Sequence, residues 1–296
     1  MKRTKQNKVV SAILTGDWHL RDNTPICRGE DFEAAQWAKV DFISKLQRKH
    51  GCLVIHAGDL FDHWKPSPYL LSKTMEYLPS QFHTIYGNHD LPQHNFEERH
   101  RCGIYALEKA GVLKVLSGTH WGDLPDSSNI DIPYNRTELR CILVYHVMTY
   151  QGRTPWPGCT DPMAAKLLRK YPNYDLIHTG HNHKAFTETH EDRLLVNAGS
   201  LTRQDADQIN FKPRVYLYYA DDNTVEPVYL PIQDDAVSRS HIERDEERSD
   251  RIEAFITKLD GDWSAGMSFE KNLELFFQSN RIRKSVKEII YKSLEA

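Results

Sequence analysis

The chain has 296 residues, enough for one large domain with a small appendage. Its five cysteines form no CxxC pair, which argues against a disulfide framework or a zinc–thiolate site and favours a reducing cytoplasm. Its formal net charge of −3 gives no overall attraction to nucleic acid, so a DNA-binding surface would have to be local. Apolar runs fall short of the ~18 residues of a membrane span, and the basic N-terminus lacks a signal-peptide cleavage site.

Short apolar runs rich in β-branched residues recur along the chain and predict buried strands that end in loops. These runs lie at residues 9–14, 52–57, 82–86, 141–146, 175–180, 193–198 and 215–220. Apolar residues spaced three to four apart predict helices between them, at 31–50, 67–78, 97–110 and 162–171. In the second of these helices, Ser67 is a suitable N-cap and Pro68 suits the first turn. Strands that alternate with helices indicate an α/β domain, which a hairpin over residues 215–232 closes.

The composition changes after residue 233. Residues 234–251 carry many charges of both signs and few apolar side chains, which predicts a linker or a solvated helix. Apolar residues then recur at helical spacing from Phe269 to Phe277 and from Ile282 to Leu294, as in two short amphipathic helices. We therefore expect a main domain over residues 1–233 and an appendage of charged linker and short helices over residues 234–296.

Polar side chains gather where the predicted strands end, which is where α/β folds build their sites. The candidate ligands in these positions are Asp17, His19, Asp59, Asn88, His146, His181 and His183. Oxygen and imidazole donors without cysteine suit Mn²⁺, Fe or Zn²⁺ better than Ca²⁺. Seven donors are too many for one tetrahedral ion, so they favour a pair of ions that share a bridging carboxylate.

Five motifs resemble, in order and spacing, those of the calcineurin-like metallophosphoesterases, over about residues 9–200. They are 16-GDWH-19, 58-GDLFDH-63, 87-GNHD-90, the isolated His146 and 180-GHNH-183. Any one of them alone is more typical of a turn or of a core histidine; the complete ordered set is what favours the family. The resemblance implies an α/β fold, a sandwich of two mixed β-sheets flanked by helices, here with a small C-terminal helical appendage.

The resemblance also implies roles for these residues. Two divalent ions are expected, Mn²⁺ first, with Fe, Zn²⁺ or Mg²⁺ as alternatives. Asp17, His19 and His183 would bind the first ion, Asp59 would bridge the two, and Asn88, His146 and His181 would bind the second. His89 would protonate the leaving oxygen or donate to the phosphoryl group, oriented by Asp90.

Two segments bear on the substrate. Protein phosphatases of this superfamily carry GDxxDRG, whereas this chain has His63 in place of that Arg, which disfavours a phosphoprotein substrate. The stretches 58-GDLFDHWKPSP-68 and 197-NAGSLTRQDADQ-208 instead look like segments of SbcD-type DNA nucleases, although Asn197-Ala198 stands where Pro is common. The resemblance makes Ser200 and Arg203 candidates for binding substrate phosphate; alternatively, Arg203 pairs with Asp205 or Asp207. His63 and His94, beside the ligand motifs, are further substrate-binding candidates.

The resulting hypothesis is an SbcD-like DNA exo/endonuclease of repair, recombination or replication that works by metal-activated water attack. The alternatives are a phosphodiesterase or phosphatase of nucleotides or other small phosphoesters, and a metal-retaining binding protein without turnover. The expected partners are DNA, an SbcC-type SMC-like ATPase that grips residues 269–294, and a second copy of the chain; equally, those helices pack on their own domain. The compact size would suit a phage enzyme in the cytoplasm of its bacterial host.

Overall fold

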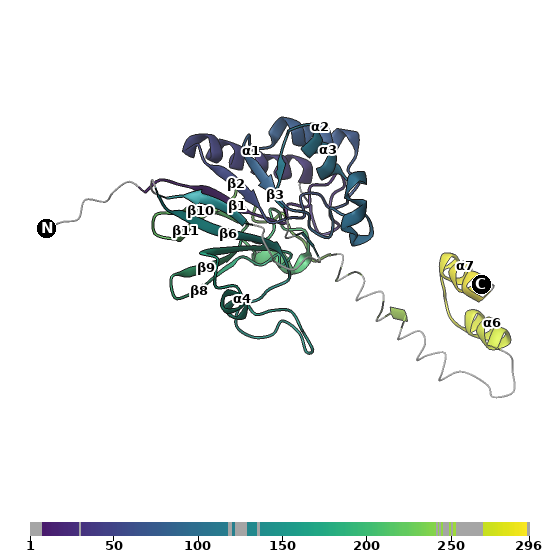
Figure 1. Ribbon diagram of the computed structural model, residues 1–296. Coiled ribbons are helices and arrows are strands. Elements are labelled where there is room, and N and C mark those ends of the chain that lie inside the picture. The colour runs from purple at the N-terminus through teal and green to yellow at the C-terminus, as the bar shows by residue number, and fades with distance from the viewer. Residues whose placement is uncertain are drawn as a thin grey trace. The chain divides into compact units, whose positions relative to one another are not determined.

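The computed structural model describes residues 8–29, 31–117, 120–121, 129–134, 137–240, 242, 244, 249, 251–252 and 269–294. The chain divides into two compact units, Met1–Ser238 and Arg239–Ala296. The first unit contains two β-sheets packed face to face with helices outside them (Figure 1). Among the described residues, no helix is both long and apolar enough to span a membrane.

The first sheet has six strands in the order β11-β10-β1-β2-β3-β4. Their bounds are β1 (Ala12–Thr15), β2 (Leu53–His56), β3 (Phe82–Thr84), β4 (Lys114–Val115), β10 (Arg214–Tyr219) and β11 (Thr224–Tyr229). Strands β1 to β4 are parallel, and the predicted hairpin of β10 and β11 adds antiparallel strands beside β1. The carboxyl ends of β1, β2 and β3 therefore lie at one edge of this sheet.

The second sheet has five strands in the order β5-β6-β7-β9-β8. Their bounds are β5 (Asn129–Pro133), β6 (Leu139–His146), β7 (Leu176–Gly180), β8 (Phe186–His190) and β9 (Arg193–Asn197). Strands β6, β7 and β9 are parallel, whereas β5 and β8 are antiparallel neighbours. Strands β4, β5 and β8 are absent from the sequence prediction; β8, for example, reads FTETH and has too few apolar residues to stand out.

The two sheets and their helices form four layers. Alternate residues of β1 point to opposite faces, so Ile13 packs under α1 (Phe32–His50), α2 (Pro68–Tyr77) and α3 (Gly103–Lys109), while Ala12 and Leu14 pack between the sheets. Helix α4 (Ala164–Lys170) covers the outer face of the second sheet through Leu167 and Leu168. Figure 1 shows α1, α2 and α3 on one side and α4 on the other. The predicted sandwich of two mixed sheets is confirmed.

Tertiary contacts break one predicted helix. The periodicity over 97–110 becomes a 3₁₀ helix, η2 (Phe96–Arg101), followed by α3, and Cys102 between them is extended at φ −99° and ψ 165°. Gly103 N donates a hydrogen bond to Trp64 O at 2.9 Å, and a Cβ at Gly103 would lie 2.4 Å from Pro66 Cγ. The docking of this glycine on the loop after β2 therefore interrupts the helix. Short 3₁₀ helices also form at η1 (Pro92–His94) and η3 (Ala206–Asn210).

The second unit contains α6 (Phe269–Ser279) and α7 (Lys284–Leu294), the two helices that the periodicity predicts. Leu273, Phe276 and Phe277 form a small apolar cluster against which Ile282 and Ile290 pack. The predicted linker lies partly outside the described residues, at positions 241, 243, 245–248 and 250. Its first part belongs to the first unit, since Val237 is buried and Ser238 N donates to Cys27 O at 2.7 Å.

Candidate metal centre

The polar side chains that follow the strands meet at one edge of the sandwich. Strands β1, β2 and β3 supply some of them and β6 and β7 supply the rest. Four of the predicted ligands adopt positive φ, a conformation rare for residues other than glycine: Asp17 (49°), His19 (45°), Asp59 (57°) and His181 (76°). Such backbone strain concentrates where surrounding structure must hold a side chain in a functional position.

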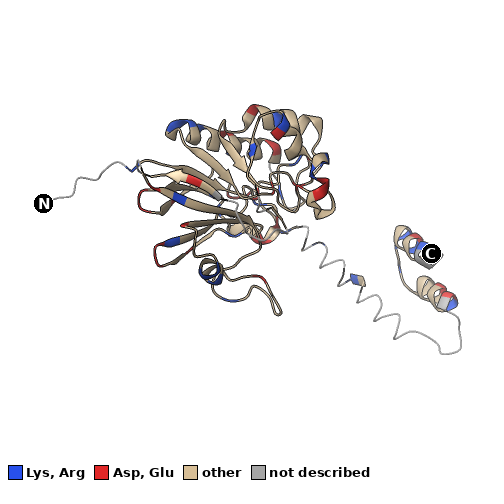
Figure 2. Cartoon of the chain, in the orientation of Figure 1, with Lys and Arg blue, Asp and Glu red and all other residues tan. Residues whose placement is uncertain are grey.

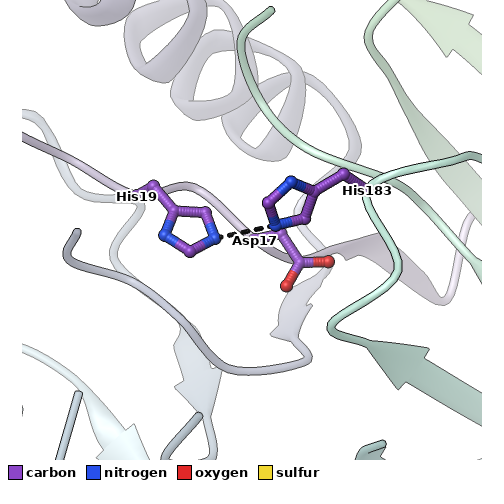
Figure 3. Close-up of side chains that lie close together, drawn as sticks. All are labelled: Asp17, His19 and His183. Carbon is purple, nitrogen blue, oxygen red and sulfur yellow. Dashed lines mark hydrogen bonds between the residues drawn. The ribbon is translucent and has the colours of Figure 1, made fainter. Parts of the chain in front are cut away.

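Asp17, His19 and His183 form the first group of candidate ligands. One ligand atom from each lies within 4.8 Å of the others. Figure 3 shows the rings of His19 and His183 pointing toward one another beside the Asp17 carboxylate, and their Nε2 atoms are 3.0 Å apart. Asp17 Oδ1 accepts a hydrogen bond from the backbone N–H of His181 at 2.8 Å, which joins the first sheet's ligands to the second's.

Asp59, His146 and His181 form the second group. His146 Nε2 lies 3.3 Å from Asp59 Oδ2, and Asn88 Oδ1 lies 3.1 Å from His146 Nε2 and 2.9 Å from His181 Nδ1. Asp59 Oδ2 is also 3.6 Å from His19 Nε2 in the first group. The Asp59 carboxylate therefore lies between the two groups, in the position that a bridging ligand needs.

The donors fit divalent metal ions. Asp17 Oδ2 and His19 Nδ1 are buried and have no hydrogen-bond partner among the described residues, a costly state unless a ligand satisfies them. Burial lowers the pKa of His19 well below its ordinary value, so the ring is neutral, as a metal ligand must be. Burial opposes ionisation of Asp59, but His146 outweighs it and lowers the pKa of this carboxyl below its ordinary value. Asp59 is thus a carboxylate anion.

Two motif glycines are required because the ligand loops pack closely. A Cβ at Gly87, before Asn88, would lie 2.1 Å from Asp59 Oδ1 and 2.5 Å from the Asp59 backbone nitrogen. A Cβ at Gly180, before His181, would lie 2.5 Å from Ala57 O. These are distances at which a side chain cannot fit. The glycines of the motifs therefore let loops from both sheets converge on the same few atoms.

A family model for the calcineurin-like phosphoesterase superfamily domain matches residues 12–216. The chain belongs to the calcineurin-like phosphoesterase superfamily. No curated protein matches the chain. Among solved structures, that of a novel archaeal phosphodiesterase is similar with 14% sequence identity and a TM-score of 0.42, over 74% of this chain and 99% of that chain.

His89 of this phosphoesterase lies beside the first group of ligands. Its ring meets that of His19 edge to face, with centroids 4.6 Å apart. His89 Nδ1 donates to the backbone carbonyl oxygen of Asp62 at 2.8 Å, which leaves Nε2 as the ring nitrogen available for another contact. Asp62 Oδ1 lies 3.8 Å from His19 Nδ1 and 3.2 Å from Arg21 Nη1. The sequence interpretation missed Asp62, although it is the second Asp of GDLFD.

Asp90 does not orient His89 as the resemblance implied. Its carboxylate is buried and accepts hydrogen bonds from four backbone N–H groups, at 2.8 to 3.3 Å: those of Asp59, Leu60, Phe61 and Gly87. Three of these donors lie in the loop that presents Asp59. Asp90 is therefore a residue that positions the Asp59 carboxylate through the backbone. The physical reason for the difference is that a buried carboxylate is best satisfied by several converging N–H groups.

Ser200 and Arg203 are buried in internal hydrogen bonds. Ser200 Oγ donates to Thr202 O at 2.8 Å. Arg203 Nη1 donates to Ile209 O at 3.1 Å, and Nη2 donates to Gln233 O. In the described part of the chain, Arg203 makes none of the expected ion pairs with Asp205 or Asp207, and its guanidinium binds backbone carbonyls instead. The Ser200 hydroxyl and the Arg203 guanidinium are therefore engaged within the protein, while the backbone N–H of Ser200 donates to His183 O at 3.3 Å, next to the first group of ligands.

His63 and His94 are both exposed. His63 Nδ1 accepts from Lys65 N at 3.2 Å, one residue after Asp62. His94 has φ 59°, and its Nδ1 donates to the backbone carbonyl of Asn88 at 2.8 Å. Sequence reasoning also missed Trp121, whose ring lies over His181 with centroids 4.8 Å apart. Trp121 follows no recognisable motif, so only the fold reveals it.

Proposed function

We propose that this phosphoesterase is a dinuclear-metal phosphodiesterase that cleaves DNA as an SbcD-like exo/endonuclease. The observation that supports it best is the pair of donor groups joined by Asp59. Two divalent ions in those groups would activate a water molecule and neutralise negative charge on the phosphoryl oxygens. The protein residues supply position. Asp59 lies between the two groups, Asn88 Oδ1 contacts His146 and His181 of the second group, and His89 Nε2 would exchange a proton with the leaving oxygen.

Local cations support a polyanionic substrate. Figure 2 shows basic and acidic residues interspersed over the described part of the chain, so binding of DNA has to rely on a few cations near the centre. A cavity of about 160 Å³ lies beside Asp62, whose carbonyl holds His89, and its lining includes the cations Arg21 and Lys65, the carboxylates Asp22 and Asp62, and His63. Lys65 is exposed there and makes no ion pair among the described residues, whereas Arg21 is held by Asp62. We assign this cavity to a phosphate next to the cleaved bond.

The hypothesis is tested by incubating the purified protein and Mn²⁺ with several substrates. These are linear and circular DNA, each single- and double-stranded, and a chromogenic bis-phosphodiester. Cleavage of DNA is expected, with hydrolysis of the small ester as well. Hydrolysis of the small ester alone would favour a phosphodiesterase of small molecules. Two bound ions without hydrolysis of any substrate would favour a binding protein. Metal content, measured on the same samples, separates loss of the ions from loss of chemistry.

Two variants calibrate that assay. His89→Ala should retain both ions and lose turnover by about 10²–10⁴-fold, the usual contribution of a proton donor. His50→Ala is the matched control, because His50 ends α1 just before β2 begins, at the opposite edge of the sheet from the ligands. It should change neither metal content nor turnover. Full activity of His89→Ala would remove His89 from its role.

We also propose that α6 and α7 bind an SMC-like ATPase, and that two chains pair. The apolar cluster around Leu273 shows how the two helices hold one another, while Val286, Ile289 and Tyr291 remain exposed on α7. Val286 and Ile289 are three residues apart and share one face of this basic helix, which suits a partner surface, whereas the Tyr291 ring meets that of Phe277 with centroids 5.7 Å apart. Replacing Ile289 by Lys should abolish co-purification with such an ATPase and leave hydrolysis of the small ester unchanged.

A further inference from the structure

Asp62 meets two different residues of the metal centre. Its backbone carbonyl accepts the hydrogen bond from His89 Nδ1, so that nitrogen is already satisfied. Its carboxylate lies beside His19, a candidate ligand of the first group, with Asp62 Oδ1 3.8 Å from His19 Nδ1. One ligand atom from each of these three residues lies within 4.8 Å of the others. The backbone of Asp62 thus serves His89, and its side chain is left for His19.

His19 has one ring nitrogen for an ion and one that needs a different partner. Its Nε2 points into the first group, 3.0 Å from His183 Nε2 and 3.6 Å from Asp59 Oδ2 (Figure 3). A neutral imidazole carries a single proton, so an ion bound at Nε2 requires that proton on Nδ1. His19 is 2% exposed, and its Nδ1 has no hydrogen-bond partner among the described residues. A buried N–H is costly without an acceptor, so the ion-bound ring calls for one beside Nδ1.

Asp62 is placed to supply that acceptor. At 3.8 Å, its Oδ1 is about 0.8 Å beyond the usual donor–acceptor distance of a hydrogen bond. The terminal torsion of an aspartate has a broad range, and the Asp62 side chain is 29% exposed, so the carboxylate has room to turn toward the ring. The backbone beneath it is fixed, because Asp62 N donates to Leu20 O at 3.1 Å. A small rotation therefore completes the hydrogen bond without moving the loop.

Arg21 holds the carboxylate from its other side. Arg21 Nη1 donates to Asp62 Oδ1 at 3.2 Å and to Gln204 Oε1 at 3.3 Å. The backbone of Arg21 is itself fixed by two hydrogen bonds with the side chain of Gln36, which is fully buried. The same oxygen of Asp62 thus lies between the guanidinium and the His19 ring. The charge-assisted bond to Arg21 keeps the carboxylate from turning away into solvent.

We propose that Asp62 is a positioning residue for the first ion, because its carboxylate accepts the Nδ1–H of His19, orients the ring and makes Nε2 a stronger ligand. Metal-binding histidines commonly donate their second N–H to a carboxylate, and loss of that acceptor weakens metal binding by about 10–100-fold. The proposal rests on the dinuclear centre of the proposed function but is independent of DNA as the substrate. It assigns the second Asp of 58-GDLFD-62 a role separate from that of Asp59.

Metal titration of variants with a single intact donor group tests the proposal. His181→Ala removes a ligand of the second group and leaves the first complete, whereas His183→Ala does the reverse. Asp62→Ala is added to each of these, and Mn²⁺ binding to the purified full chain is measured by isothermal calorimetry. In the His181→Ala background, Asp62→Ala should raise the dissociation constant of the remaining ion by about 10–100-fold. In the His183→Ala background it should leave the dissociation constant unchanged.

Two further variants are controls for the loss of a side chain and of a charge. Asp62→Asn keeps an oxygen acceptor, so in the His181→Ala background it should retain most of the affinity that Asp62→Ala loses. Asp22→Ala removes a carboxylate that lines the same cavity as Asp62. Asp22 belongs to none of the candidate metal groups in the described part of the chain, so its loss should change neither dissociation constant.

Three results would overturn the proposal while leaving the metal centre in place. They are an unchanged dissociation constant for Asp62→Ala in the His181→Ala background, an equal rise in both backgrounds, and a loss with Asp62→Asn as large as with Asp62→Ala. The second result would indicate a general loosening of the centre, and the third would exclude an acceptor role. A wild type that binds no Mn²⁺ would instead overturn the proposed function together with this inference.

Discussion

Replacing Asp90 by Ala and by Asn tests how the phosphoesterase holds the Asp59 carboxylate. Asp90→Ala removes the acceptor of four buried backbone N–H groups, those of Asp59, Leu60, Phe61 and Gly87. Each unsatisfied buried donor costs about 1–3 kcal/mol, so the lower bound for four is about 4 kcal/mol of unfolding free energy. The loop that presents Asp59 should loosen as well, and metal binding should weaken.

Asp90→Asn is the matched variant, because it keeps an oxygen acceptor and removes the negative charge. Burial, followed by the nearby Asp59, raises the pKa of Asp90 to about 7, so the ionised form already carries a cost that Asn avoids. We therefore expect a loss of only about 1 kcal/mol, with both ions retained. Since His89 is held by the Asp62 carbonyl, turnover per bound ion should stay close to that of the wild type.

Urea unfolding, metal analysis and hydrolysis of a bis-phosphodiester, all on the same preparations, provide the measurements. His89→Ala serves as the reference for loss of the proton donor. If Asp90→Asn kept both ions and full stability but lost turnover about 100-fold, Asp90 would act on His89 after all, and the role in the Asp59 loop would be refuted. Equal stability of the Ala and Asn variants would refute the hydrogen-bond argument.

Three further predictions follow from single contacts. Gly87→Ala should lose metal and about 1–3 kcal/mol of stability, because its Cβ would lie 2.1 Å from Asp59 Oδ1. Gly29→Ala is the control and should lose neither, because a Cβ at Gly29 would meet no atom within 4 Å. Metal analysis and urea unfolding measure both effects. Burial opposes protonation of His146, but Asp59 raises its pKa to about 9, so the ring is protonated at pH 7 before metal binds. Metal binding at pH 7 should therefore release about one proton, and the affinity should increase up to about pH 9. Calorimetry in two buffers of different ionisation enthalpy measures the number of protons released. Ser67→Ala should cost about 1 kcal/mol in urea unfolding with unchanged metal content, since it removes the N-cap of α2.

The sequence alone identified most of what is local in this chain. Buried strands are recognisable because the runs are short, β-branched and bounded by turn residues, and the cap of α2 is recognisable from Ser67-Pro68. The ligand motifs are recognisable because parallel strands bring their carboxyl ends to one edge of a sheet. Order along the chain was therefore enough to name seven residues that the structure brings together, and to recognise the superfamily.

Only the tertiary structure decided what depends on side-chain packing between distant segments. Asp62 and Asp90 are both acidic residues close to ligands in the sequence. Their spacing does not show that the backbone carbonyl of Asp62 binds His89 or that the Asp90 carboxylate holds the Asp59 loop. Arg203 follows a family-like segment, yet it turns inward beside Arg28 and Lys39 from elements far apart in sequence. Side-chain direction depends on φ/ψ, loop closure and the packing of both sheets. Those quantities depend on the whole fold, so a local sequence pattern does not determine them.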